Sequence, residues 1–135
     1  MNILDSSAYL AYLRKEKGGD FLKKLSQQCR VDGVTIFMHQ INFLEVVYKV
    51  KTKLPAYDIQ SLLVEFSSPW WGKINYLDSD LMLIAAELKA KYQSASLGDC
   101  IGLASTKIFQ GTFWTADQLL SDIGAKENIT VKLIR

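Results

Sequence analysis

The chain has 135 residues, of which 49% are hydrophobic and 22% are charged, a composition typical of a globular protein that is long enough to bury a core. The net charge of +2 argues against non-specific nucleic-acid binding over the whole surface, but it does not exclude a local basic patch. No apolar run reaches the roughly 18 residues of a membrane span, and Met1 leads into Asn2-Ile3-Leu4 without a charged leader. We expect one domain over residues 1–135, in the cytoplasm, with no membrane segment and no signal peptide.

The cysteines and the histidine limit the kinds of metal site and catalytic site that the chain could form. Cys29 and Cys100 lie in unrelated contexts without metal-type spacing, so we expect two reduced thiols in the core. His39 is the only histidine, which argues against a zinc site or a histidine-based catalytic triad.

The first half of the chain alternates short apolar runs with amphipathic stretches. Asp5 directly follows the first run, and Ser6 and Ser7 are residues that favour a helix start. The pattern predicts, in order, a strand over 2–4, a helix from 6 to near 17, a helix over 20–29, a strand over 34–38 and a helix over 41–51.

The helix expected over 41–51 has an uneven distribution of side chains. Asn42, Glu45 and Lys49 form one narrow polar stripe on a surface that is otherwise mostly apolar. We therefore expect this helix to be largely buried and Glu45 to be only partly exposed.

The second half of the chain continues the alternation. It predicts a helix starting at Pro55, a strand over 74–77, a helix opening at Asp78 or Ser79, a helix from Leu97 to Gly111, a strand over 112–115, one helical turn over 117–120 and an edge strand over 129–134. Trp70 and Trp71 favour core or dimer packing, and stacking on an RNA base is the alternative.

Strands that alternate with helices indicate an α/β fold. We expect a three-layer α/β/α sandwich with a mainly parallel central sheet. Sites in such folds gather outside the carboxyl ends of the strands. Four acids occupy positions expected at that edge, namely Asp5, Glu45, Asp99 and Asp117.

Each of these acids also has an ordinary structural explanation. Asp5 and Asp117 could cap the helices that follow them, and Asp99 could form a capping pair at the start of its helix. Glu45 could pair with Lys49 one helical turn away. Four such coincidences at a single edge are much less expected than any one of them.

Converging carboxylates would limit the chemistry of the site. Two like charges about 4 Å apart repel by roughly 4 kcal/mol at an effective dielectric constant near 20. Such a cluster must share protons or hold a cation, and an all-oxygen site favours Mg²⁺ or Mn²⁺. The reaction that matches is metal-assisted hydrolysis of phosphodiester bonds.

Four segments, in this order, resemble the PIN domain family and, within it, the VapC-like toxins of prokaryotic toxin–antitoxin pairs. They are Leu4-Asp5-Ser6-Ser7, Asn42-x-x-Glu45, Leu97-Gly98-Asp99-Cys100-Ile101-Gly102-Leu103-Ala104 and Phe113-Trp114-Thr115-Ala116-Asp117. The resemblance implies a ribonuclease that depends on Mg²⁺ or Mn²⁺. It also implies a homodimer and a small antitoxin as a protein partner.

The resemblance assigns roles to particular residues. Asp5, Glu45, Asp99 and Asp117 match the catalytic and metal-binding acids of the family, and Thr115 and Asn42 match supporting positions. Many members carry a further acid shortly after the fourth. Gln118 and Leu119 stand there instead, which leaves open whether one or two metal ions bind.

Lysines near the acids are candidates for contacts with RNA phosphates. Lys49 and Lys51 follow Glu45 on the same helix, and Lys49 shares the polar stripe of Glu45. The alternative is a solvated helix end that touches no nucleic acid.

Two other classes of function remain compatible with the sequence. One is a PIN-like module that binds RNA or protein without cleaving, with its acids serving the structure. The other is a phosphate-transfer or receiver-type α/β domain, which expects paired acids near the start of the chain. Asp5 stands alone after its strand, and Glu45 has no place in such a domain.

Overall fold

The computed structural model describes all 135 residues and has a five-stranded, fully parallel sheet at its centre. The strand order is β3-β2-β1-β4-β5. The strands are β1 (Asn2–Leu4), β2 (Ile36–His39), β3 (Trp71–Ile74), β4 (Thr112–Thr115) and β5 (Val131–Leu133). The helices are α1 (Ser6–Leu13), α2 (Gly19–Asp32), α3 (Gln40–Lys53), α4 (Ile59–Glu65), α5 (Ser79–Lys91), α6 (Leu97–Phe109) and α7 (Gln118–Glu127).

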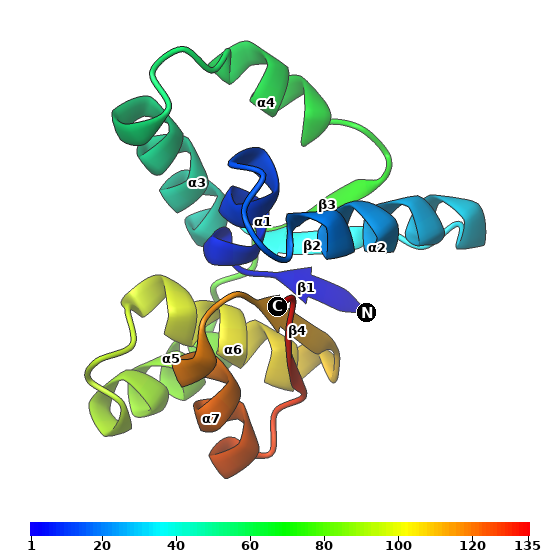
Figure 1. Cartoon of the computed structure of the whole chain (residues 1–135). Coiled ribbons are helices and arrows are strands. Elements are labelled where there is room, and N and C mark those ends of the chain that lie inside the picture. The colour runs from blue at the N-terminus through cyan, green and yellow to red at the C-terminus, as the bar shows by residue number, and fades with distance from the viewer.

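The helices form two layers that cover the two faces of the sheet (Figure 1). Helices α1 to α4 lie on one face and α5 to α7 on the other, and each layer closes over its own hydrophobic cluster. Successive side chains of β1 point to opposite faces of the sheet. Leu4 packs in the first cluster, under α1 to α4, and Ile3 packs in the second cluster, under α5 to α7. The expected three-layer α/β/α sandwich with a parallel sheet is confirmed.

The sheet order places a topological switch point beside β1. The strands on one side of β1 run β2 then β3, and those on the other side run β4 then β5. Ligands of open parallel sheets bind outside the carboxyl ends of the strands at such a point. Asp5 leaves β1 at this edge, and its backbone N–H donates to the carbonyl of Trp114 in β4 at 3.1 Å.

Several predicted boundaries were wrong. The strand expected over 74–77 is β3, over Trp71–Ile74, where Trp71 turns into the core and Gly72 lies against the Phe37 ring, which leaves no room for a side chain. The helix expected from Pro55 begins only at Ile59, because the Asp58 side chain caps it by accepting from the N–H of Gln60.

The C-terminal part also differs from expectation. The single turn expected over 117–120 is the ten-residue helix α7, which ends at Asn128 in a left-handed conformation. Leu120 and Ile123, on the buried face of α7, pack in the second cluster. The edge strand expected over 129–134 is confirmed in place but is shorter, over Val131–Leu133.

Helix α3 is less buried than expected. Phe43, Val46 and Val50 are in the core, whereas Leu44 is 63% exposed and Tyr48 is 61% exposed. The sequence pattern was apolar around most of the helix, but only one side of it faces the sheet. The expectation that this helix is largely buried was therefore wrong, and its outer apolar residues form part of the surface. Glu45 is partly exposed, as expected.

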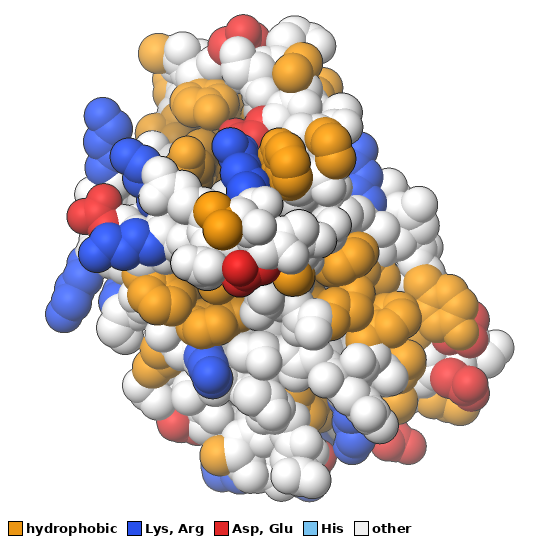
Figure 2. Space-filling model, turned by 90° about the vertical axis from the view of Figure 1, so that its right-hand side faces the viewer, with side chains coloured by type: hydrophobic (Ala, Val, Ile, Leu, Met, Phe, Trp, Pro, Cys, Tyr) orange, Lys and Arg blue, Asp and Glu red, His pale blue; other side chains and the backbone are white.

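Figure 2 shows the side of the molecule that lies to the right in Figure 1, where the N-terminus and the start of β1 lie. Hydrophobic side chains reach this surface in several places, and Lys and Arg gather along one side of it (Figure 2). The acids at the carboxyl ends of the strands lie at the opposite edge of the sheet. No helix combines the length and the hydropathy that a membrane crossing requires.

Candidate active site

Asp5 occupies the centre of the carboxyl edge and is 1% exposed. Its carboxylate accepts hydrogen bonds from Ser7 Oγ at 2.8 and 2.9 Å, from the N–H of Ala8 at 2.8 Å and from Thr115 Oγ1 at 2.7 Å. Burial raises the pKa of Asp5 to about 6, because the hydrogen bonds that favour the ionised form only partly offset the loss of hydration. The negative charge of Asp99 raises it further.

Two hydroxyl groups tie the end of β1 to the end of β4 around Asp5. Thr115 Oγ1 donates to Asp5 and accepts from the N–H of Asp117 at 3.0 Å, while Ser7 Oγ accepts from the N–H of Ala116 at 3.0 Å. Thr115 lies where a supporting residue was expected. Ser7 was interpreted as a helix-starting residue and as part of the segment Leu4-Asp5-Ser6-Ser7, but it was not assigned to the site, although a hydroxyl two positions after Asp5 was a usable signal.

Asp99 lies in the first turn of α6 and is half-buried. It forms a capping box with Ser96, whose N–H donates to Asp99 Oδ2 at 2.9 Å and whose Oγ accepts from the N–H of Asp99 at 3.1 Å. The pKa of Asp99 is raised by burial, lowered by the two Ser96 hydrogen bonds, and raised again by the charges of Glu45 and Asp117. The pKa of Asp99 is therefore affected by two of the other acids, and the pKa of Asp5 is affected by Asp99.

Glu45 reaches the site from α3. If Gly98 carried a Cβ, that atom would lie 3.4 Å from Glu45 Oε2, so the carboxylate lies against the first turn of α6. Asn42, one turn earlier and fully buried, donates from Nδ2 to the carbonyl of Gly98 at 3.2 Å and so holds α3 against α6. The Asn42 Oδ1 atom is buried without a partner.

Asp117 completes the set from the end of β4. It is exposed, and its Oδ1 caps α7 by accepting from the N–H of Leu119 at 2.9 Å. The next residue, Gln118, donates from Nε2 to Asp122 at 2.9 Å. The position where a further acid was sought is therefore occupied by an amide that bonds along its own helix.

The structure thus gives these acids ordinary structural roles as well as a shared location. Asp5, Asp99 and Asp117 each cap a helix, and Glu45 pairs with Lys49 at 2.7 Å, as the simpler explanations required. The four carboxylates nevertheless interact electrostatically. The charges of Glu45 and Asp117 raise the pKa of Asp99, and the charge of Asp99 raises the pKa of Asp5. The carboxylates therefore lie close enough for their charges to interact, and no hydrogen bond joins one of them to another.

The donor set suits a hard divalent cation. All four groups are carboxylates, and Asp99 Oδ1, Asp117 Oδ2 and Glu45 Oε2 have no hydrogen-bond partner in the protein. Burial and mutual repulsion raise the pKa values of Asp5 and Asp99, and a cation would relieve that repulsion. No three acidic, histidine or cysteine side chains are arranged to hold a metal ion as they stand.

The two lysines proposed for RNA binding differ in environment. Lys49 is engaged by Glu45, and both side chains are about one-third exposed. Lys51 is exposed in the last turn of α3. Both stay predictions as contacts with RNA.

His39 has a structural role. Its Nδ1 accepts from the N–H of Ile41 at 3.1 Å and caps α3, and its Nε2 lies 2.8 Å from the carbonyl of Tyr76. This pairing places the proton on Nε2. Burial lowers the pKa of His39, which keeps the ring neutral. The buried thiols of Cys29 and Cys100 are both free, as expected.

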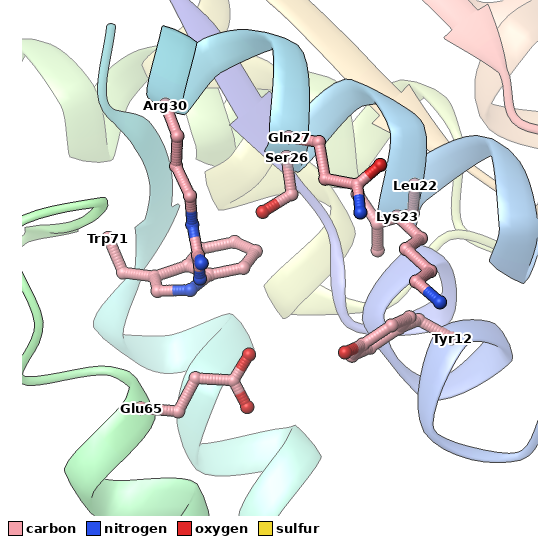
Figure 3. Close-up of a pocket in the computed structure, with 8 residues that line it drawn as sticks. All are labelled: Tyr12, Leu22, Lys23, Ser26, Gln27, Arg30, Glu65 and Trp71. Carbon is pink, nitrogen blue, oxygen red and sulfur yellow. The ribbon is translucent and has the colours of Figure 1, made fainter. Parts of the chain in front are cut away.

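A separate cavity lies between α1, α2, α4 and β3. Its volume is about 150 Å³, and Figure 3 shows Arg30 and Lys23 of α2 on its upper side, Glu65 of α4 below and Trp71 at its wall. Trp71 is a core residue, as one interpretation of the tryptophan pair required, whereas Trp70 is 38% exposed with the Arg30 guanidinium 5.6 Å from its ring centre. The residues of this cavity are distinct from the four acids.

The fold and the edge of carboxylates define a class of protein. The PIN domain family matches the chain over residues 3–126, so the chain belongs to the PIN domain family. None of the curated proteins compared with it matches the sequence.

Two of the solved structures that share the fold are chains of toxin–antitoxin complexes. A chain of the VapBC2 complex from Rickettsia felis, bound to a DNA fragment from its promoter, is 15% identical, with a TM-score of 0.69 and coverage of 98% of this chain and 97% of that chain. A chain of a toxin–antitoxin complex from Klebsiella pneumoniae is also 15% identical, with a TM-score of 0.61 and coverage of 87% of each chain.

Proposed function

We propose that the protein is a ribonuclease that depends on Mg²⁺ or Mn²⁺ and acts as the toxin of a toxin–antitoxin pair. Membership of the PIN domain family and a fold shared with chains of two toxin–antitoxin complexes support a nuclease. The observation that carries the proposal is the convergence of the acids at the carboxyl edge of the sheet. Thr115 Oγ1 donates to Asp5 and accepts from the N–H of Asp117, and Glu45 lies against the first turn of α6, which contains Asp99. In agreement with this proximity, the charges of Glu45 and Asp117 raise the pKa of Asp99, and Asp99 raises that of Asp5.

The roles of the residues follow from their surroundings. Asp5, Glu45, Asp99 and Asp117 would hold the divalent ion, which when bound supplies activation of the attacking water and stabilisation of the leaving oxygen. Ser7 and Thr115 hold the Asp5 carboxylate in one orientation through hydrogen bonds of 2.7 to 2.9 Å. Asn42 keeps Glu45 beside Asp99 by joining α3 to Gly98.

The proposed partners are RNA, an antitoxin and a second copy of the chain. The antitoxin is suggested by the two complexes that share the fold. A homodimer is suggested by the exposed apolar residues Ile41, Leu44 and Tyr48 on α3. Light scattering of the purified chain measures whether a dimer forms.

The proposal is tested by titrating Mn²⁺ into the metal-free protein by calorimetry and by assaying RNA cleavage in Mn²⁺. We expect Asp5→Asn and Asp99→Asn, which keep shape and remove charge, to lose both metal binding and cleavage. Asp80→Asn is the matched control, because Asp80 lies in the first turn of α5 as Asp99 does in α6, and it is exposed. That variant should bind and cleave like the parent.

The opposite result would favour the alternative function. A parent protein that binds RNA but neither binds Mn²⁺ nor cleaves would be a PIN-like module whose acids serve only as helix caps. The capping bonds of Asp5, Asp99 and Asp117 are the observation that keeps this alternative open.

A further inference from the structure

An open groove of about 560 Å³ lies directly beside the acids, on the side of β5. It is lined by Ser7, Ala116, Asp117, Gln118, Leu133 and Arg135. Two of these residues belong to the candidate site, because Ser7 Oγ donates to Asp5 and Asp117 is one of the four acids. The groove is therefore continuous with the place where the acids gather.

The sheet holds Arg135 in this groove. Leu133 pairs with Thr115 across β4 and β5, and the N–H of Ile134 donates to the Thr115 carbonyl at 2.9 Å. Ile134 is 4% exposed and anchors the segment in the first hydrophobic cluster. The backbone that carries Arg135 thus runs beside the segment from Thr115 to Asp117.

Arg135 has no acidic partner. The three ion pairs of the structure are Arg14–Glu16, Lys49–Glu45 and Lys91–Glu127. The acidic site consequently has two different flanks. On the α3 flank the cation Lys49 is neutralised by Glu45, and on the β5 flank the cation Arg135 is free.

We infer that Arg135 binds a phosphate of the RNA strand next to the scissile bond, with the adjoining nucleoside lying in the groove against Leu133. This inference rests on the proposed ribonuclease function. A guanidinium binds phosphate oxygens with paired hydrogen bonds, and a cation at this point offsets the repulsion between the carboxylates and the RNA backbone. Leu133 supplies an apolar wall for the nucleoside, while the Gln118 amide is already bonded to Asp122.

The test measures binding of a fluorescein-labelled single-stranded RNA of random sequence, by anisotropy, over a range of salt concentrations. EDTA is present, so binding does not require metal. For Arg135→Ala we expect affinity to fall several-fold at low salt and the slope of log K against log salt to shrink by about 0.7, the value for one phosphate contact on a single strand. Arg135→Lys should keep the slope.

The control is Lys126→Ala, which removes an exposed cation from the opposite end of α7. Its slope and affinity should equal those of the parent. A parent and an Arg135→Ala variant with equal slopes would overturn the inference, as would a parent that shows no RNA binding at low salt.

Cleavage in Mn²⁺, measured in parallel, separates this inference from the proposed function. If the parent cleaves, Arg135→Ala should raise KM and largely retain kcat, because Arg135 lies outside the group of acids. A parent that cleaves with unchanged KM and salt slope in the variant refutes only the phosphate contact. A parent that never cleaves, but whose slope still depends on Arg135, refutes the nuclease and the place next to a scissile bond, and retains only a contact between Arg135 and an RNA phosphate beside the acids.

Discussion

The two halves of the acidic site are built in different ways. The strand half, from β1 and β4, contains Asp5 fully buried among three donors that come from Ser7, Ala8 and Thr115. The helix half, from α3 and α6, contains Glu45 and Asp99, which are half-buried. Its contacts are a capping box and an ion pair at the surface.

The strand half therefore holds its carboxylate in one orientation, whereas the carboxylates of the helix half can change orientation. The carboxylate of Asp5 cannot turn without breaking buried hydrogen bonds, whereas Glu45 and Asp99 can exchange their present partners for a cation by changing side-chain torsions. Buried polar contacts are costly to leave unmade, and exposed ion pairs contribute little. Substitutions in the strand half should therefore have the larger effects.

The largest expected effect concerns Asp5 in the metal-free protein. Its pKa is about 6 in the folded state against an ordinary value of 3.8, so the folded state binds more protons than the unfolded state between these values. The free energy of unfolding should consequently fall as the pH rises from about 4 to 6, by roughly 3 kcal/mol from this group, and then level off. Asp5→Asn should remove that fall.

Urea unfolding in EDTA, followed by tryptophan fluorescence at a series of pH values, measures this difference. Asp80→Asn is the control, and its profile should run parallel to that of the parent. Parallel profiles for the parent and Asp5→Asn would mean that the buried carboxyl titrates alike in the folded and unfolded chains, and the description of the strand half would be wrong.

An intermediate effect is expected at Thr115. Thr115→Val keeps the shape but removes the donor to Asp5 and the acceptor for the N–H of Asp117. We expect a loss of about 1–2 kcal/mol in the free energy of unfolding. Because the lost hydrogen bond lowers the pKa of Asp5, that pKa should rise, and the acidic limb of any Mn²⁺-dependent cleavage should move to higher pH.

Thr112→Val provides the comparison, since Thr112 lies in the same strand and its hydroxyl makes no hydrogen bond to the protein. If Thr115→Val loses stability without a shift of the pH profile, the role of Thr115 is only to join β1 to β4. It would then have no influence on the ionisation of Asp5.

The same division explains what could be predicted from the sequence. The strands around Asp5 and Asp117 and the sandwich were predictable, because short apolar runs, turn residues and capping signals are local. Asp99 was placed in a capping pair for the same reason. Contacts between segments far apart in the sequence were not predictable in this way. Examples are the hydrogen bond from the N–H of Ala116 to Ser7 Oγ, and the position of Arg135 in the same groove as Asp117.

Errors in the prediction share a cause. The strand expected over 74–77 lies over Trp71–Ile74, where Gly72 packs against the Phe37 ring in a tertiary contact that the local sequence does not show. The outer side of α3 was expected to be covered because its sequence is apolar, yet Leu44 and Tyr48 are exposed. Local pattern shows which residues could be buried, but it does not show which side meets the sheet.

The smallest expected effect is in the helix half, at Lys49. The ion pair with Glu45 spans one turn of α3 and is about one-third exposed, so Lys49→Ala should change the free energy of unfolding by only about 0.3–0.5 kcal/mol. We still expect this variant to bind RNA more weakly and with a smaller salt slope, which anisotropy titrations at several salt concentrations would measure. Lys53→Ala, at the exposed end of the same helix, is the matched control. An unchanged slope would show that Lys49 serves only to neutralise Glu45, which would leave Arg135 as the cation beside the acids that is free to meet a phosphate.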